Sequence, residues 1–251
     1  MPAVLENDVL VYKGSNFFRQ RLLLSTLSGR AVKIEEIRSG HDDPGLREYE
    51  VNLIRLLDKV TNGTRVELSE TGTSVYFQPG ILIGGQVTHS CCTQRGVGYY
   101  LEILLALGPF CKEPLNAVLQ GVTHSDLDVS VDKVKAAALP ILLKFILVDD
   151  GLELKVVRRG KKIKQFEEFL IKRRKHIYLF SNNLFQVGPL SDYTISFLQH
   201  LKEFFGVMFK LEVQRTDDDE DSSDDEQVST AHKVKMTCVG IGYVNISKRT
   251  L

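Results

Sequence analysis

The sequence predicts an α/β (α+β) fold of repeated βαβαββ-type modules, with helices packed on mixed sheets and the last module incomplete. Three observations lead to this prediction. Short strand-like runs alternate with longer segments of helical periodicity over roughly the first 160 residues. The same order of segments occurs twice in that part of the chain. Glycine, proline and asparagine separate the segments, as expected for turns.

Residues 1–80 are predicted to form the first module. Its expected strands are 8–12, 31–37, 66–68 and 74–77, and its expected helices are 17–27 and 46–60. Gly29 follows the first helix at the position where a left-handed glycine commonly ends a helix. Residues 81–160 are predicted to form the second module, with strands at 86–89, 115–120 and 152–157 and helices at 98–107 and 131–145.

Residues 161–186 differ from both modules because lysine and arginine are dense and turn residues are scarce. The segment is expected to form an amphipathic helix followed by a strand. Its basic run, 161–175, is open to three interpretations: contact with RNA phosphate, a nuclear import signal, or an insert without function.

Residues 187–251 regain regular patterning. Ser191 is expected to cap a helix that ends at Gly206, and strands are expected at 207–213, 233–239 and 242–246. Three polar residues of that helix are expected to point away from its apolar face, either as partner contacts or as plain exposed residues: Gln199, His200 and Lys202.

The loop 216–230 is strongly acidic and is predicted to be disordered. Ser222 and Ser223 within it are followed by acidic residues and are candidate phosphorylation sites. A solvated tether between two strands is the favoured alternative.

Composition excludes several classes of protein. The chain has 32 Lys and Arg against 32 Asp and Glu, so its net charge gives no indication of a partner. Its four cysteines show no zinc-binding spacing, which indicates reduced thiols in a cytosolic or nuclear protein. The start of the chain is not typical of a secretory signal, and the longest apolar stretch, 136–148, is too short to span a membrane.

No metal, cofactor or catalytic motif is found. The loop neighbours His41/Asp42 and His124/Asp126 are candidates for acid–base chemistry only if an unrecognised site exists.

Several segments taken in order resemble the RNA 3′-terminal phosphate cyclase superfamily, and within it the cyclase-like, ribosome-assembly branch. The segments that carry the resemblance are Phe17–Arg30, Ile37–Leu46, Phe77–Gly85, Arg95–Tyr100, Gly121–Asp132, Gly188–Leu211 and Val234–Ser247. The resemblance covers approximately residues 8–160 and 187–249, so 161–186 matches nothing in the family and the interpretation as an insert is favoured. Members of the family are also longer than this chain, which indicates an internal truncation after about residue 160.

The resemblance implies a non-catalytic protein. True cyclases carry a glycine-rich loop after the first strand, where this chain has Phe17 and Phe18. They also carry an adenylylated histidine near the start of the late helix, and that place falls on Tyr193. A phenol keeps its proton at neutral pH and is a poor replacement for imidazole.

For the branch, the resemblance implies pre-rRNA processing and small (40S) ribosomal subunit biogenesis in the nucleus and nucleolus. The implied partners are the pre-ribosomal particle, a ribosome-assembly GTPase and pre-rRNA, with no membrane and no cofactor. Four arginines near predicted strand–helix junctions are candidate RNA contacts: Arg19, Arg38, Arg95 and Arg158. Two alternatives stay open: an RNA-processing enzyme (a 3′-phosphate cyclase or a pre-rRNA endonuclease), or a non-functional truncated product.

Overall fold

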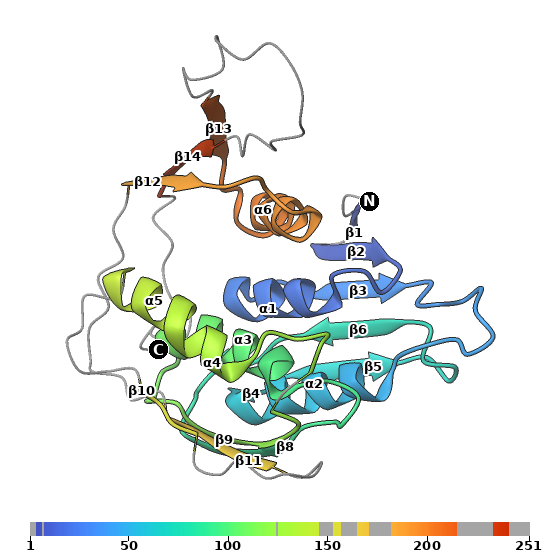
Figure 1. The fold of residues 1–251 in the computed structure, drawn as a ribbon. Coiled ribbons are helices and arrows are strands. Elements are labelled where there is room, and N and C mark those ends of the chain that lie inside the picture. The colour runs from blue at the N-terminus through green and yellow to red at the C-terminus, as the bar shows by residue number, and fades with distance from the viewer. Residues whose placement is uncertain are drawn as a thin grey trace, which may run out of the picture. The chain divides into compact units, whose positions relative to one another are not determined.

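The fold is shown in Figure 1 as a computed structural model, which describes residues 4–6, 8–123, 125–145, 153–156, 165–170, 182–214 and 233–240. These residues form two compact units, one within residues 1–179 and the other within residues 180–243. The α/β fold expected from the sequence is confirmed, with helices and mixed sheets in the larger unit. In the described part of the chain, no helix combines the length and the apolar character needed to cross a membrane.

The first module is built on a five-stranded sheet. Its elements are β1 (Val4–Glu6), β2 (Val9–Lys13), α1 (Phe18–Ser28), β3 (Val32–Glu35), α2 (Glu48–Val60), β5 (Arg65–Leu68) and β6 (Val75–Gln78). The strand order is β1-β2-β3-β6-β5. β2 and β3 are parallel, whereas β6 is antiparallel to both β3 and β5. Val32, Ile34, Val75 and Phe77 are buried, which fits the alternation that predicted the strands.

The second module repeats this topology. Its elements are β8 (Gln86–Ser90), α3 (Val97–Leu107), β9 (Asn116–Gly121), α4 (Val131–Lys133), α5 (Leu139–Phe145), β10 (Glu153–Leu154) and β11 (Gln165–Leu170). The strand order is β10-β11-β9-β8, with β8 and β9 parallel and the other pairs antiparallel. A π-helical stretch, Val134–Ala138, joins α4 to α5. The repeat inferred from the sequence is therefore present in the strand order as well.

Strand β11 corrects one expectation. Residues 165–170 were expected in an amphipathic helix, but they pair antiparallel with β9 from Gln165 opposite Gly121 to Leu170 opposite Asn116. An edge of β9 offers unpaired backbone groups that a neighbouring segment satisfies by adding a strand. Periodicity alone cannot anticipate this, because the pairing partner lies more than 40 positions earlier in the chain. β11 takes the same place in its sheet as β6 in the first module.

A small ladder was not anticipated from the sequence. β4 (Thr61–Asn62) pairs antiparallel with β7 (Ile81–Leu82), directly after α2. A short 3₁₀ turn, Gly108–Phe110, follows α3. Both are two- or three-residue elements, which leave too weak a pattern for sequence-based assignment.

Helix α2 also protects the free edge of the second sheet. β8 ends the strand order, so its outer edge has no strand partner among the described residues. Lys59 Nζ donates to the Thr88 carbonyl at 2.8 Å, and Asn52 Nδ2 donates to the Ser90 carbonyl at 3.0 Å. These bonds satisfy carbonyl groups that would otherwise invite another chain to pair.

The second unit is smaller. Its described residues contain β12 (Asn182–Val187), α6 (Asp192–Phe205), β13 (Phe209–Gln214) and β14 (Lys233–Val239), with the strand order β12-β14-β13. This is one helix and three strands, fewer than either module of the first unit. Ser191 caps α6 by accepting a bond from the Thr194 amide, and Gly206 ends the helix with φ 70°, as expected. The expected strand 242–246 lies outside the described residues.

Glycine at position 98 is required by close packing in the second module. A Cβ atom at Gly98 would lie 1.9 Å from the Val129 carbonyl oxygen, whereas one at Gly40 would meet nothing within 4 Å. We expect Gly98→Ala to lower the free energy of unfolding by about 3 kcal/mol, the upper part of the range for overpacking. Gly40→Ala is the control and should change it by less than about 0.5 kcal/mol. Urea unfolding of both variants measures this, and equal stability would contradict the packing argument.

Candidate nucleic-acid interface

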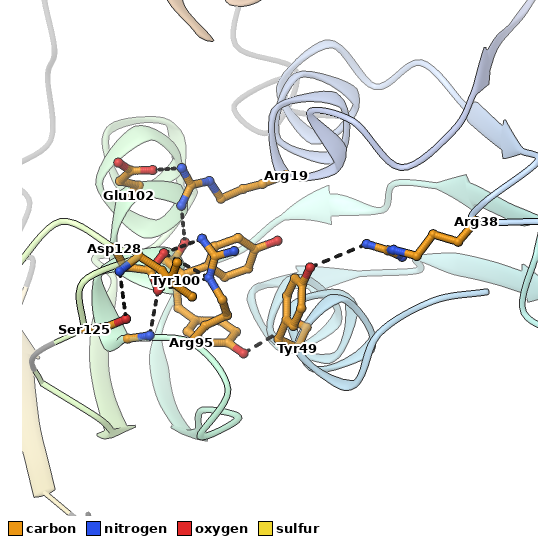
Figure 2. A network of polar contacts seen from close by, with 11 residues as sticks. Arg19, Arg38, Tyr49, Arg95, Tyr100, Glu102, Ser125 and Asp128 are labelled. Atoms are coloured by element: carbon orange, nitrogen blue, oxygen red, sulfur yellow. Dashed lines mark hydrogen bonds and ion pairs between the residues drawn. The ribbon is translucent and has the colours of Figure 1, made fainter. Parts of the chain in front are cut away.

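The candidate RNA contacts lie where parallel strands end. Arg19 follows β2, Arg38 follows β3 and Arg95 follows β8, while Asp128 lies in the segment after β9. In open α/β sheets, the carboxyl ends of parallel strands are where ligand sites form. Figure 2 shows that these residues, from both modules, converge on one network of polar contacts.

Arg19 connects α1 to α3. Its Nη1 donates to the Tyr99 carbonyl at 3.1 Å, and its guanidinium carbon lies 4.7 Å from the centre of the Tyr99 ring. The same guanidinium forms an ion pair with Glu102, one turn further along α3. Burial raises the pKa of Glu102, although the Arg19 charge opposes that shift. Arg19 therefore holds the two modules together by charge and stacking at once.

Arg95 is held from two sides. Its Nε and Nη2 donate to Asp128 Oδ1 at 3.1 and 2.5 Å, and Nε also reaches Oδ2 at 3.0 Å. Asp128 Oδ2 in addition accepts a bond from the Gly96 amide at 2.7 Å, which caps the start of α3 with a negative charge. The Arg95 guanidinium carbon lies 4.5 Å from the Tyr99 ring centre and 5.2 Å from that of Tyr49. Arg95 thus stacks between two aromatic residues while paired to a buried carboxylate.

Arg38 forms a third paired site beside the first two. Its Nη1 and Nη2 donate to Glu50 Oε2 and Oε1 at 2.8 and 2.7 Å, and Nη1 also donates to the Gly45 carbonyl at 3.0 Å. Glu50 Oε2 also accepts the Arg47 amide at 2.7 Å, at the start of α2. The hydrogen bond to Glu50 raises the pKa of Arg38. Arg38 has a left-handed backbone with φ 49°, whose cost of about 1–2 kcal/mol is offset by these bonds.

Two tyrosines join the three sites. Arg38 Nη2 lies 3.5 Å from the Tyr49 hydroxyl, and the Tyr49 and Tyr99 rings meet edge to face with centres 5.6 Å apart. Burial raises the pKa of Tyr99, so its hydroxyl stays neutral. The network is therefore a set of three arginine–carboxylate pairs around a tyrosine core.

This pairing limits what the arginines can do chemically. Their side chains are only 14%, 15% and 23% exposed for Arg19, Arg38 and Arg95. Each guanidinium charge is matched by a carboxylate, so the network offers little net positive charge to a phosphate. Their role as RNA contacts stays a prediction, whereas their role in joining α1, α2 and α3 follows from the geometry.

The other candidates are placed differently. Gln199 and Lys202 are exposed on α6, as expected, but His200 is buried. The expectation that His200 points to solvent is therefore wrong. The buried residues of α6 are His200 and Phe204, while the apolar Ile195 on the same helix is 41% exposed. Helical periodicity shows which residues share a face of a helix. Where neighbouring faces each mix polar and apolar residues, it does not show which face is buried.

Some candidates cannot be placed. Arg158, His124, Ser222 and Ser223 lie outside the described residues. His41 and Asp42 are exposed in the loop between β3 and α2. Within the described part of the chain, no group of His, Cys, Asp and Glu could hold a metal ion.

A buried histidine was missed by the sequence analysis. His89 on β8 is buried, and its Nε2 lies 2.8 Å from Asn52 Oδ1. Asn52 Nδ2 donates to the Ser90 carbonyl and Oδ1 accepts the Cys92 amide, so the orientation of the amide is fixed. His89 Nε2 is therefore the donor and carries the proton. Its Nδ1 has no hydrogen-bond partner among the described residues. The signal in the sequence was the alternation of side chains along β8, which places His89 on the buried, apolar face of the strand.

Comparison with known proteins identifies the relatives. Residues 10–164 match the family model of the RNA 3′-terminal phosphate cyclase. A Drosophila melanogaster protein named "Probable RNA 3'-terminal phosphate cyclase-like protein" is 37% identical over 385 residues, which cover the whole of both chains. The Homo sapiens "RNA 3'-terminal phosphate cyclase-like protein" is 34% identical over 371 residues, which cover 95% of this chain and 97% of the relative. The Schizosaccharomyces pombe "rRNA processing protein rcl1" is 45% identical over 149 residues, covering 59% of this chain and 41% of the relative.

The alignment lengths also bear on the internal truncation. The 385 aligned positions of the Drosophila melanogaster relative exceed the 251 residues of this chain by 134. At least that many positions of the relative therefore face no residue here. The family model stops at residue 164, close to where the resemblance was expected to end.

The Arg38–Glu50 pair should contribute to stability. We expect Glu50→Gln to lower the free energy of unfolding by about 2–3 kcal/mol, because it leaves a mostly buried guanidinium without an anionic partner. The control is Glu67→Gln, which removes one partner of the exposed Arg65–Glu67 pair and should cost less than about 0.5 kcal/mol. Chemical unfolding measures both, and equal losses would show that the pair is not structural.

His89 should make stability depend on pH. Burial, with the nearby charges of Lys59 and Arg55, lowers its pKa from 6.5 to about 4. Between about pH 6.5 and pH 4, His89 is protonated in the unfolded chain but stays neutral in the folded chain. The free energy of unfolding should therefore fall from about pH 6.5 to 4, by up to about 1.4 kcal/mol per pH unit.

His89→Gln is the variant that tests this pH dependence, because glutamine can still donate to Asn52 but does not titrate. Its stability should fall less steeply with pH than that of the wild type over the same range. His41→Gln, in an exposed loop, is the matched control and should follow the wild type. Parallel curves for all three proteins would contradict the assignment.

Proposed function

The chain belongs to the RNA 3′-terminal phosphate cyclase family, in its cyclase-like branch, and from this we propose that it is a non-enzymatic factor in pre-rRNA processing. One relative carries rRNA processing in its name. The proposal includes action in small (40S) subunit biogenesis in the nucleolus, with a ribosome-assembly GTPase and pre-rRNA as partners.

The loop between β2 and α1 supports the proposal that the protein is not an enzyme. Phe17 has a left-handed backbone with φ 58°, a conformation that glycine adopts without strain. The loop thus has a glycine-like backbone shape at a residue with a large side chain. Phe18 is buried at the first position of α1. A phenylalanine side chain at this turn obstructs the close approach of backbone amides to a phosphate, on which glycine-rich nucleotide loops depend.

Two further features support the proposal. Tyr193, in the first turn of α6, is exposed and occupies the place that the resemblance gives to the adenylylated histidine. The Arg21 side chain donates to the Gly14 carbonyl at 2.8 Å and stacks on Tyr12, so the start of α1 is tied to the protein's own backbone. Both features favour a binding role over nucleotidyl transfer.

We expect no self-adenylylation when the purified chain is incubated with Mg²⁺ and ATP. Intact mass spectrometry detects an AMP adduct directly, and a true cyclase with its histidine nucleophile is the positive control. An adduct on this chain would overturn the non-enzymatic assignment. Peptide mapping would then show whether Tyr193 or another residue carries it.

The same preparation separates the enzymatic alternatives. End-phosphorylated RNA is incubated with the protein, and the products are resolved by size and by end chemistry. A cyclic phosphate would favour a cyclase, whereas internal cleavage would favour an endonuclease. A thermal scan addresses the third alternative, because a sharp cooperative transition would count against a product that cannot fold.

A further inference from the structure

Helix α2 carries two cations that differ from the paired arginines of the network. Arg55 and Lys59 are four residues apart, so they lie on one side of α2, and both are exposed. Among the described residues, neither forms an ion pair with a carboxylate. Arg19, Arg38 and Arg95, by contrast, each have one. The uncompensated charge of this unit therefore includes a pair of cations on α2.

Both cations lie beside strand β8. Lys59 donates to the Thr88 carbonyl at the open edge of that strand. The charges of Lys59 and Arg55 also contribute, after burial, to the lowered pKa of His89 on the same strand. The hydrogen bond places the Lys59 charge at the edge of β8, and Arg55 lies one turn before Lys59 on the same helix.

The strand itself adds no opposing charge. β8 and its neighbour β9 contain no Asp or Glu. The exposed side chains of β8 are neutral and polar, namely Gln86, Thr88 and Ser90, and Ser90 donates to Gln120 of β9 at 3.2 Å. Three acidic residues lie on α2: Glu48, about two turns before Arg55, Glu50, which is paired with Arg38, and the exposed Asp58, which follows Arg55 by three residues. A polyanion approaching this edge meets cations on the helix and neutral hydrogen-bonding groups on the strand.

We propose that Arg55 and Lys59 contact the phosphate backbone of an RNA strand that runs along the open edge of β8. The inference rests on the proposed function, because it identifies the surface through which a pre-rRNA-binding protein holds its RNA. Phosphate contacts of this kind are independent of sequence and depend strongly on salt. The paired arginines then serve to position α2 against α1 and α3.

The test is a double variant with a matched control. Arg55→Gln/Lys59→Gln removes both unpaired cations while keeping hydrogen-bonding side chains. Lys33→Gln/Arg65→Gln removes the same charge from two exposed strand residues that are paired with Glu35 and Glu67. The probe is a fluorescent single-stranded oligouridine of about 20 nucleotides, followed by anisotropy between about 50 and 200 mM KCl.

We expect the α2 variant to bind about tenfold more weakly than the wild type and to lose about 1–1.5 from the slope of log K against log salt. The control variant should stay within about twofold of the wild type. Thermal scans of both variants establish that they are folded. If the wild type binds but the two variants are affected equally, the α2–β8 surface is wrong while the proposed RNA-binding role stands. If the wild type does not bind the probe at any salt concentration, both are overturned.

Discussion

The burial of guanidinium groups where the two modules meet is the constraint on which the rest of the larger unit depends. Arg19, Arg38 and Arg95 sit at the junction of α1, α2 and α3, with little access to water. A buried cation is tolerated only when an anion and hydrogen-bond acceptors surround it. Glu102, Glu50 and Asp128 meet that demand, and two tyrosine rings fill the space between the pairs. The relative position of the helices follows from satisfying these charges.

Strand edges are the second constraint. The first sheet is complete within its module, whereas the second is completed by β11, which comes from beyond the end of the family match. Asn52 and Lys59 of α2 each donate a hydrogen bond to one carbonyl group at the free edge of β8. The smaller unit has only one helix for its three strands among the described residues. Leu211 and Val213 of β13 are 47% and 65% exposed there. Strand β13 thus exposes apolar side chains.

Equal numbers of basic and acidic residues hide a difference that matters for function. Arg19, Arg38 and Arg95 form ion pairs with carboxylates, while Arg55 and Lys59 form none among the described residues. A count of arginines near strand ends therefore overestimates the surface available to RNA. The loop with Phe17 and Phe18 and the exposed Tyr193 support the proposed non-enzymatic role, and Arg55 and Lys59 support the proposed contact with RNA.

Most elements could be predicted, in order and in type, from local sequence patterns. Short strand-like runs predicted β2, β3 and β9, helical periodicity predicted α1 to α3, and Ser191 and Gly206 predicted the ends of α6, because these signals are local. The order of the motifs also indicated the family. The strand pairing of residues 165–170, the burial of His200 and the surroundings of His89 became visible in the folded chain alone. It alone showed which arginines are neutralised. Each of these features depends on contacts with residues distant in the chain, and a local sequence pattern carries no information about such contacts.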